Sequence, residues 1–351
     1  MKRIINISLL GALTFFAFVR CSDWTEPEAL QYDHPLTESS YGEEYYKNLR
    51  AYKARTDHVK AFAWYSDWTG TGTDIYGRLV GLPDSMDFVS MWGNNFNLSE
   101  SKQKDLQEVQ TKKGTKVLMC WIVDNIGVQT TPPEVVEAGT QKEFWGWAGE
   151  AADDAVIEAA IRKYARSIID TMYKYGFSGF DLDLEPHYGS PGNIASYPDR
   201  LHILLDELSK EMGPASGTDR MLCVDGEPDW LLPETGLLLD HFLLQAYYDS
   251  NYPATDGRLN ALFNTFKSVM TREEIIRKTI LTSNFESFGG TGGPTYRLRD
   301  GSSVNQLKAY AMYSYPDVNA KIGGIGAFRI KFDENYKYLR EAIQVANPVI
   351  K

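Results

Sequence analysis

The stretch FSGFDLDLEP, residues 177–186, places acids at every second position: Asp181, Asp183 and Glu185. Apolar residues fill the positions between them, Phe180, Leu182 and Leu184. Side chains on a strand alternate between its two faces, so this stretch has one acidic and one apolar face. In a closed barrel of parallel strands, one face packs on the surrounding helices and the other points to the axis. We therefore expect the acids inside such a barrel, with Glu185 nearest the C-terminal mouth, where enzymes of this fold carry their chemistry.

The rest of the chain repeats a pattern of short apolar runs separated by helical segments. Strands are predicted at residues 60–65, 86–92, 116–123, 179–185, 221–224, 241–247, 278–284 and 324–330. Helices are predicted at residues 43–55, 155–175, 198–212, 259–270, 304–315 and 334–345. Eight such units fit an α/β fold of the (β/α)8 TIM-barrel type, which takes ~250 residues as a single domain. The alternative fold is an open doubly wound sheet, but no GxGxxG motif follows the first strand, which counts against it. For the acidic strand itself, the alternative is a solvated strand with its acids pointing outward.

The N-terminus has the pattern of a secretion signal. Two basic residues, Lys2 and Arg3, precede a mostly apolar run at 4–19 that is too short for a good membrane span. Cys21 directly after this run resembles the lipidated cysteine of bacterial lipoprotein signals, and ordinary cleavage nearby is the alternative. We expect a signal peptide at 1–20, a tether and N-terminal extension at 21–55 and the barrel at 56–351. Lipidation of Cys21 would anchor the protein at the outer membrane or cell surface.

Composition narrows the partners and cofactors. The net charge of −11 argues against nucleic acid, whose phosphates need a basic surface. The aromatic content of 13% suits either stacking on sugars or a large core. Cys120 and Cys223 lie in apolar runs and are expected to be buried thiols, unless their strands come close enough for a disulfide. No CxxC pair or histidine cluster indicates a metal, and we expect no cofactor.

Three acids on one strand face must influence one another. At ~3.3 Å per residue, successive acids lie about 6.6 Å apart. Carboxylates at such separations do not all ionise easily, so at least one pKa is expected to rise and the acids to titrate as a set. A raised pKa would let Glu185 keep a proton near neutral pH and donate it to a leaving oxygen.

The segment SGFDLDLE resembles the DGxDxDxE signature of glycoside hydrolase family 18, which contains chitinases and endo-β-N-acetylglucosaminidases. The match comprises Gly179, Asp181, Asp183 and Glu185, and it falls on the fourth predicted strand, where the family carries it. Ser178 stands where the signature begins with Asp, and Pro186 follows Glu185 where the family often has Tyr. The SxGG motif of the chitinases is not visible at the third strand.

The resemblance implies substrate-assisted retention, an exception to catalysis by two enzyme carboxylates. Glu185 would protonate the glycosidic oxygen and later act as the base. Asp183 would hold the 2-acetamido group of the substrate, whose oxygen attacks the anomeric carbon and forms an oxazolinium. Asp181 would support Asp183.

The sixth predicted strand, LLQAYYDS, distinguishes the members of the family. Gln245 and Tyr247 lie two apart and would share a face. Chitinases usually show MxYD there, whereas endo-β-N-acetylglucosaminidases that act on N-glycans often show Gln or Asn with Tyr. By this resemblance Tyr247 would bind the acetamido group and Gln245 the sugar at the cleavage site. A structural hydrogen bond inside the barrel is the alternative for Gln245.

Other strand ends supply candidates for the binding site at the mouth. Phe328 stands where the family often keeps a Trp under the reacting sugar. Trp145 and Trp147 in the segment after the third strand could form a glycan platform or anchor a loop. The substrate-binding candidates are Tyr65, Asp67, Trp92, Trp121, His187, Asp225, Asn284, Phe328 and Arg329.

These patterns favour a surface-anchored endo-β-N-acetylglucosaminidase whose partner is an N-acetylglucosamine-containing glycan or glycoprotein. The alternatives are a chitinase or chito-oligosaccharide hydrolase, and a glycan-binding lipoprotein without activity. The presence of Glu185 argues against the last, because inactive family members commonly lose this residue.

Overall fold

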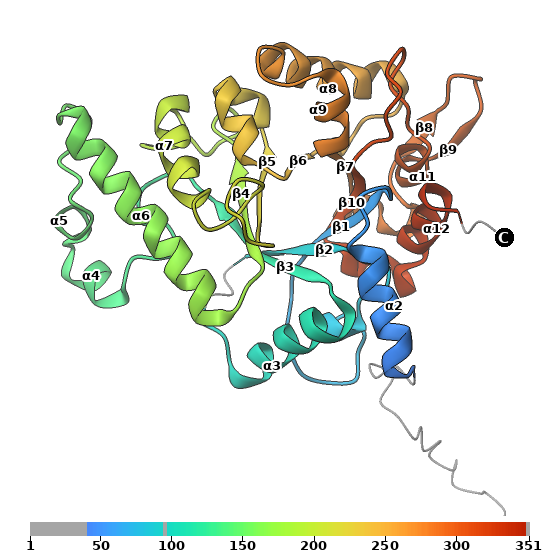
Figure 1. The fold of residues 1–351 in the computed structure, drawn as a ribbon, viewed down its shortest axis with the longest axis horizontal. Coiled ribbons are helices and arrows are strands. Elements are labelled where there is room, and N and C mark those ends of the chain that lie inside the picture. The colour runs from blue at the N-terminus through green and yellow to red at the C-terminus, as the bar shows by residue number, and fades with distance from the viewer. Residues whose placement is uncertain (1–40, 94–96, 349–351) are drawn as a thin grey trace, which may run out of the picture. The chain divides into compact units, whose positions relative to one another are not determined.

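Eight parallel strands close into a barrel at the centre of the fold (Figure 1). The computed structural model describes residues 41–93 and 97–348. The hydrogen-bonded order around the barrel is β1-β10-β7-β6-β5-β4-β3-β2. The strands are β1 (Lys60–Tyr65), β2 (Phe88–Trp92), β3 (Lys116–Ile122), β4 (Gly179–Leu184), β5 (Met221–Gly226), β6 (His241–Leu244), β7 (Thr279–Asn284) and β10 (Gly324–Phe328). The TIM-barrel prediction is confirmed, and the open-sheet alternative is wrong.

The predicted strands differ from the observed ones mainly at their ends. The largest difference is at β6, which ends at Leu244 although the alternating pattern continues to Tyr247. The amide of Ala246 donates to the carbonyl oxygen of Leu244 and so turns the chain out of the ladder. Gln245 and Tyr247 therefore project from a turn above the strand. Glu185 likewise lies one residue beyond the end of β4.

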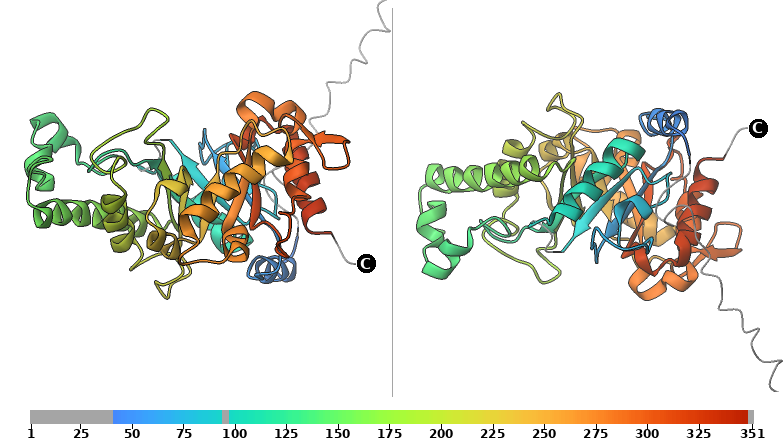
Figure 2. Two further views of the ribbon diagram at one scale, coloured as in Figure 1. Left: turned by 90° about the horizontal axis from the view of Figure 1, so that it is seen from above. Right: turned by 90° about the horizontal axis from the view of Figure 1, so that it is seen from below.

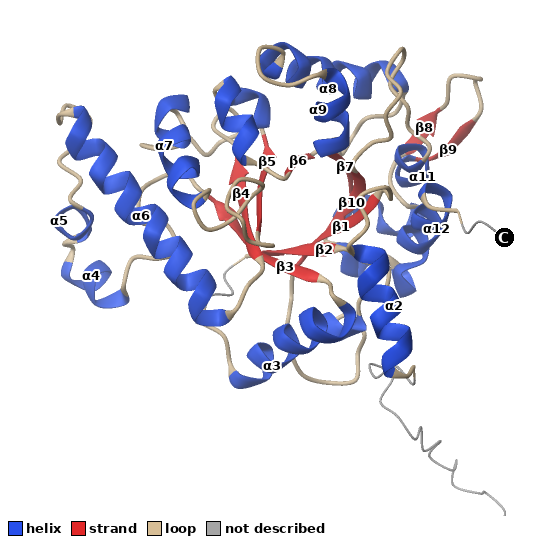
Figure 3. Cartoon of the chain, viewed as in Figure 1, coloured by secondary structure: helices blue, strands red, loops and turns tan. Residues whose placement is uncertain are grey.

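Helices surround the barrel (Figure 3). The helices are α2 (Glu43–Lys53), α3 (Glu100–Glu108), α4 (Pro133–Ala138), α5 (Gln141–Trp145), α6 (Asp154–Tyr175), α7 (Pro198–Leu208), α8 (Tyr252–Phe266), α9 (Arg272–Lys278), α10 (Phe285–Phe288), α11 (Gln306–Ala311) and α12 (Lys337–Ala346). A short antiparallel hairpin, β8 (Thr295–Arg297) and β9 (Ser303–Asn305), precedes α11. All three views place α4, α5 and α6 together on one side of the barrel (Figures 1 and 2).

The ends of the helices follow their capping residues. The apolar period of α6 predicts its extent closely, and Gly176 ends it in the left-handed conformation at φ 77°. The helix α8 begins earlier than its apolar period predicts, because Asn251 caps it and Pro253 occupies its first turn. The helix α9 was not predicted. It is only seven residues long and begins at a capping box of Thr271 and Glu274.

The two faces of β4 separate as the alternation predicts. Phe180, Leu182 and Leu184 are fully buried in the large apolar cluster between barrel and helices. A second cluster fills the barrel interior, with Phe62, Trp64, Phe88, Leu118, Cys120, Met221, Cys223, Leu243 and Ile280. Asp181 and Asp183 therefore point inward, and the alternative of an outward-facing acidic strand is wrong.

The N-terminal extension is described only from residue 41. The predicted helix at 43–55 is present as α2. The predicted signal peptide, most of the tether and Cys21 lie outside the described residues, so the boundaries of these segments stay predictions. Among the residues that the structure describes, no helix has the length and apolar character needed to span a membrane.

Candidate active site

A cavity of about 210 Å³ opens at the C-terminal end of the barrel strands. Its wall is formed by Trp64, Trp92, Ile122, Asp183, Glu185, Asp225, Gln245, Tyr247 and Phe328. Seven of these nine were predicted as catalytic or substrate-binding residues, and Trp64 and Ile122 were not. The structure thus brings three acids, an amide and four aromatic rings together at the mouth of one barrel, although they come from six different strands or strand ends.

Glu185 and Asp225 are linked through one amide group. The Nε2 atom of Gln245 donates to Glu185 Oε1 at 2.8 Å and to Asp225 Oδ1 at 2.9 Å. Glu185 is half-buried, whereas Asp225 is fully buried. The structural alternative for Gln245, a hydrogen bond inside the barrel, is therefore present. The same side chain also lines the cavity, where it can contact a bound substrate.

Asp183 and Asp225 face each other on neighbouring strands. Their Cα positions are register partners of β4 and β5. Burial raises the pKa of Asp183, and the negative charge of Glu185 raises it further. Burial and the charges of Asp183 and Asp181 raise the pKa of Asp225 well above its ordinary value. The rise in pKa predicted for the acids of this strand thus occurs on Asp183, and also on Asp181, where burial is the main cause. The shift of Asp225 was not predicted.

Asp181 lies one layer deeper in the barrel. Ser90 Oγ on β2 donates to its Oδ2 atom at 2.6 Å. Among residues 41–93 and 97–348, the Oδ1 atoms of Asp181 and of Asp183 are buried and have no hydrogen-bond partner. A buried acceptor without a partner costs free energy, on the order of 1–3 kcal/mol. Since Asp183 lines the cavity, its Oδ1 atom is suited to accept a hydrogen bond from a bound ligand.

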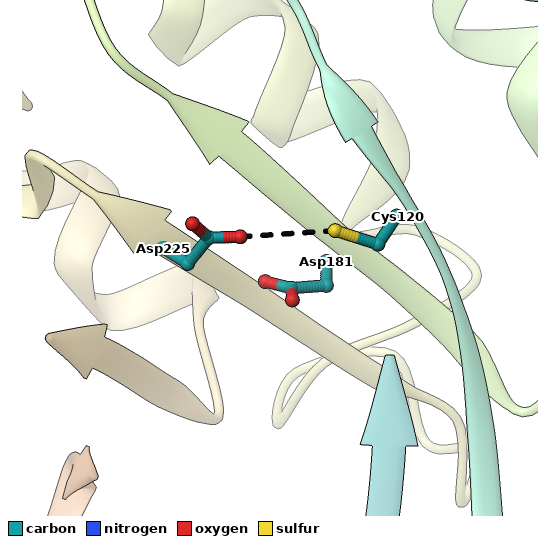
Figure 4. A group of neighbouring side chains, drawn as sticks. All are labelled: Cys120, Asp181 and Asp225. Atoms are coloured by element: carbon teal, nitrogen blue, oxygen red, sulfur yellow. Dashed lines mark hydrogen bonds between the residues drawn. The ribbon is translucent and has the colours of Figure 1, made fainter. Parts of the chain in front are cut away.

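Cys120, Asp181 and Asp225 point toward one another from β3, β4 and β5 (Figure 4). One potential ligand atom from each lies within 4.8 Å of the others. The Cys120 thiol donates to Asp225 Oδ2 at 3.8 Å. This contact, together with Ser90, gives the cluster hydrogen-bond partners without a metal ion, and the expectation of no metal stays a prediction. Cys120 and Cys223 are free, buried thiols, so the disulfide alternative is wrong.

Four aromatic rings form the apolar part of the wall. Phe328 is their centre, with ring centroids 5.5 Å from Trp92, 5.8 Å from Tyr247 and 6.3 Å from Trp64. Trp64 was not among the predicted substrate-binding residues. The last residue of β1, Tyr65, was expected to line the mouth of the barrel instead. Alternation along β1 puts Phe62 and Trp64 on the inner face together, and that was the available signal.

Three predicted substrate-binding residues do not line this cavity. Tyr65 is a correction, because it is fully buried on the outer face of β1 and its hydroxyl donates to the carbonyl oxygen of Tyr76. Trp121 is also directed outward, where its Nε1 donates to Tyr164 Oη at 3.1 Å, and it borders only a neighbouring cavity. Asn284 caps α10 by accepting from the amide of Ser287 at 3.1 Å.

Three further candidates are engaged with partners outside the cavity lining. Asp67 forms an ion pair with Lys331. Arg329 pairs with Glu286 at 2.7 Å, and its guanidinium carbon lies 5.7 Å from the ring centre of Trp92. His187 bonds to Glu227 and packs edge-on against Trp230. Their predicted contact with substrate is not supported by the lining of this cavity.

The tryptophans of the α4–α5 segment fit the loop-anchoring alternative. Trp145 is buried and its Nε1 atom donates to Thr131 Oγ1 at 2.9 Å. The guanidinium carbon of Arg200 lies 5.4 Å from the ring centre of Trp147. Ser178, where the sequence departs from the DGxDxDxE pattern, donates to Gln110 Oε1 and does not line the cavity.

A parallel eight-stranded barrel with clustered carboxylates and an aromatic wall at its C-terminal mouth is the arrangement of a glycoside hydrolase. Comparison with known families agrees with this class. The chain belongs to glycoside hydrolase family 18: the family model described as "Glycoside hydrolase family 18, BT1044-like" matches residues 25–345. No curated protein matches the chain.

Solved structures of the same fold include three that are informative. A selenomethionine form of BT1044 with one Glu-to-Gln substitution is 32% identical, with a TM-score of 0.77, and the alignment covers 90% of this chain and 98% of that one. An endo-β-N-acetylglucosaminidase mutant from Cordyceps militaris, in complex with fucosyl-N-acetylglucosamine-Asn, is 16% identical with a TM-score of 0.57 and coverage of 90% and 99%. A chitinase-like agglutinin from Robinia pseudoacacia is 12% identical with a TM-score of 0.50 and coverage of 82% and 99%.

Proposed function

We propose that the protein is a retaining endo-β-N-acetylglucosaminidase that cleaves the GlcNAc-β1,4-GlcNAc core of N-glycans. The observation that carries this proposal is the pairing of two features in one cavity. Asp183 offers a buried oxygen without a hydrogen-bond partner, and Glu185 lies two residues further along the same chain at the mouth. The first suits the N–H of a 2-acetamido group, and the second suits the glycosidic oxygen.

The proposed reaction proceeds in two steps through the substrate's own acetamido group. In the first, Glu185 protonates the glycosidic oxygen, the bond from that oxygen to the anomeric carbon breaks, and the acetamido oxygen bonds to this carbon. The product is an oxazolinium ion, whose N–H donates to Asp183. In the second, Glu185 takes a proton from water while the water oxygen bonds to the anomeric carbon, and the bond from that carbon to the acetamido oxygen breaks. Two inversions at the anomeric carbon give net retention.

The cavity wall suits a bound sugar in this reaction. Phe328, Trp92 and Trp64 present apolar ring surface of the kind on which a sugar face packs. Burial raises the pKa of Tyr247 well above its ordinary value, so its hydroxyl keeps its proton and can donate to the acetamido oxygen. Interactions that strengthen as charge develops on this group lower the barrier rather than only tightening binding.

Adjoining cavities extend the binding surface beyond the site of cleavage. A second cavity of about 330 Å³ shares Trp92 and Ile122 with the first, and a third of about 470 Å³ shares Val128 and Gln129 with the second. Together they extend from the acids to the α4–α5 segment. Such a surface has room for sugars beyond those flanking the scissile bond.

Incubation with an N-glycoprotein, followed by mass spectrometry of both products, tests the proposal. The protein should retain one GlcNAc per site while the remaining glycan is released intact. Glu185→Gln is the control, and it should lower the rate by about 100-fold or more, since general acid catalysis contributes that much. Failure of the wild type to release glycan from high-mannose and complex substrates would refute the assignment. Binding without turnover by both forms would instead favour the glycan-binding alternative.

We also propose that the chain is a lipoprotein displayed at the bacterial outer membrane or cell surface. The proposal is supported only by the sequence at 2–21. Cys21→Ala should move the protein from the membrane fraction to the soluble fraction of its native host. If the variant and the wild type both stay soluble, Cys21 carries no anchor.

A further inference from the structure

Asp225 is the most enclosed polar group of the cavity wall. Its side chain has no solvent exposure, and it lies near the end of β5 beside Asp183 of β4. Its side chain accepts hydrogen bonds from the Gln245 amide and the Cys120 thiol. Neither donor carries a positive charge, so nothing in these contacts offsets a buried negative charge on Asp225.

Two carboxylates that face each other in a dry interior do not both ionise. Removing an unpaired carboxylate from water costs several kcal/mol, and a second negative charge nearby adds to this cost. A proton held between the pair removes one of the two charges and supplies a hydrogen bond. Within the described part of the chain, the titratable groups that face Asp225 are acids, a thiol and a phenol. They are Cys120 on β3, Asp181 and Asp183 on β4, Glu185 after β4 and Tyr247 after β6.

We propose that Asp225 is a positioning residue that keeps its proton, donates it to Asp183 and accepts the amide of Gln245, which in turn orients Glu185. The proposal rests on the proposed function and deepens it, because it names the group that aligns both reacting acids. The raised pKa of Asp225 and its register pairing with Asp183 on the neighbouring strand agree with this arrangement.

The arrangement also explains why the Gln245 amide has one orientation. Both acceptors of its Nε2 atom are carboxyl oxygens, so a flipped amide would turn its own oxygen toward them and lose both hydrogen bonds. Asp225 thus fixes Asp183 directly and Glu185 through Gln245. Loss of this alignment should lower turnover more than substrate binding, because small displacements of reacting groups are costly.

Two substitutions of Asp225 distinguish the effect of its hydrogen bonds from the effect of its side-chain volume. Asp225→Asn resembles the protonated acid, since its amide N–H can donate to Asp183 and its oxygen can accept from Gln245. Asp225→Leu has similar size and no hydrogen bonds. We expect the Asn variant to lose less than about tenfold in kcat, and the Leu variant about 100-fold or more with KM changed less than about threefold. Wild-type kcat in the Leu variant, or equal losses in both variants, would overturn the proposal.

The melting temperature as a function of pH gives a readout that needs no activity. A carboxyl group whose pKa is raised by folding stabilises the fold fully below its unfolded pKa and loses this contribution as pH rises toward its folded pKa. The wild type should therefore lose more stability between pH 5 and pH 9 than either Asp225 variant. Identical pH slopes in wild type and variants would show that Asp225 does not hold a proton.

Asp240→Asn is the matched control. Burial also raises the pKa of Asp240, which accepts from the Leu222 amide at 2.9 Å at the start of β6, away from the cavity. This control should flatten the pH slope of the melting temperature while leaving kcat near the wild-type value.

A wild type that releases no glycan would refute the proposed function, whereas the pH slopes would still decide whether Asp225 is protonated.

Discussion

At the residue scale, the chemistry of the site depends on hydrogen bonds that connect acids across strands. Gln245 contacts both Glu185 and Asp225, and Asp225 is paired in register with Asp183. No single strand contains this network, because its members come from β4, β5 and the turn after β6. The low polarity of the barrel interior strengthens each of these bonds and makes an unpaired member costly.

Gln245→Leu removes the amide that joins two of these acids. Glu185 and Asp225 each lose a donor, and Glu185 gains freedom to rotate away from the leaving oxygen. We expect kcat to fall by about 10- to 100-fold, with a smaller change in KM. Steady-state kinetics on a defined N-glycan substrate measure this split. Gln107→Leu, at an exposed position of α3, is the control and should change neither parameter; equal kinetics in the two variants would contradict the role of Gln245.

At the scale of single elements, β4 depends on the glycine that begins it. Gly179 has φ 147°, and a Cβ atom there would collide with the carbonyl oxygen of Met221 at the start of β5. The close approach of these two backbones lets Asp183 and Asp225 face each other further along the pair. Backbone contact therefore sets the register on which the acid network is built.

Gly179→Ala should destabilise the barrel strongly, by about 3 kcal/mol or more, because the clash adds to backbone strain. Thermal unfolding of the variant measures this loss. Gly217→Ala is the matched control, since Gly217 also has a positive φ, 72°, but open space around its Cα. A melting temperature of Gly179→Ala as high as that of Gly217→Ala would show that the collision is relieved without cost.

The alternation in DLDLE predicted β4 and the inward direction of its acids, since one strand carries that information. The same rule gave the wrong face for Tyr65. The last residue of β1 was assumed to point into the barrel, whereas Phe62 and Trp64 form its inner face. The role of Asp225 was beyond prediction, since it depends on the register of β5 against β4. The helix α3 has few apolar residues, so its period gave no signal.

At the scale of the whole molecule, α2 of the N-terminal extension is tied to the barrel by a buried lysine. Lys53 Nζ donates to Thr115 Oγ1 at 2.7 Å, just before β3. Burial lowers the pKa of Lys53 to about 7. The charged form is thus disfavoured in the fold, so Lys53 costs stability below pH 7, and this cost disappears as pH rises toward the unfolded pKa near 10.5.

Lys53→Met should therefore raise the melting temperature most at pH 6, and its advantage should shrink by pH 9. The thioether side chain fills a similar volume and carries no charge to bury. Thermal unfolding at the two pH values measures the difference. An advantage that is equal at both pH values, or larger at pH 9, would contradict the cause assigned to the pKa shift.

The stereochemistry of cleavage distinguishes substrate-assisted catalysis from direct attack by water. Substrate-assisted catalysis by Asp183 and Glu185 predicts that the newly formed reducing end is the β-anomer before mutarotation mixes the two forms. Proton NMR during the first minutes of hydrolysis of a chitobiose-core glycan distinguishes the anomers. We expect the β-anomer first; an initial α-anomer would mean direct attack by water and would rule out substrate-assisted catalysis by Asp183 and Glu185.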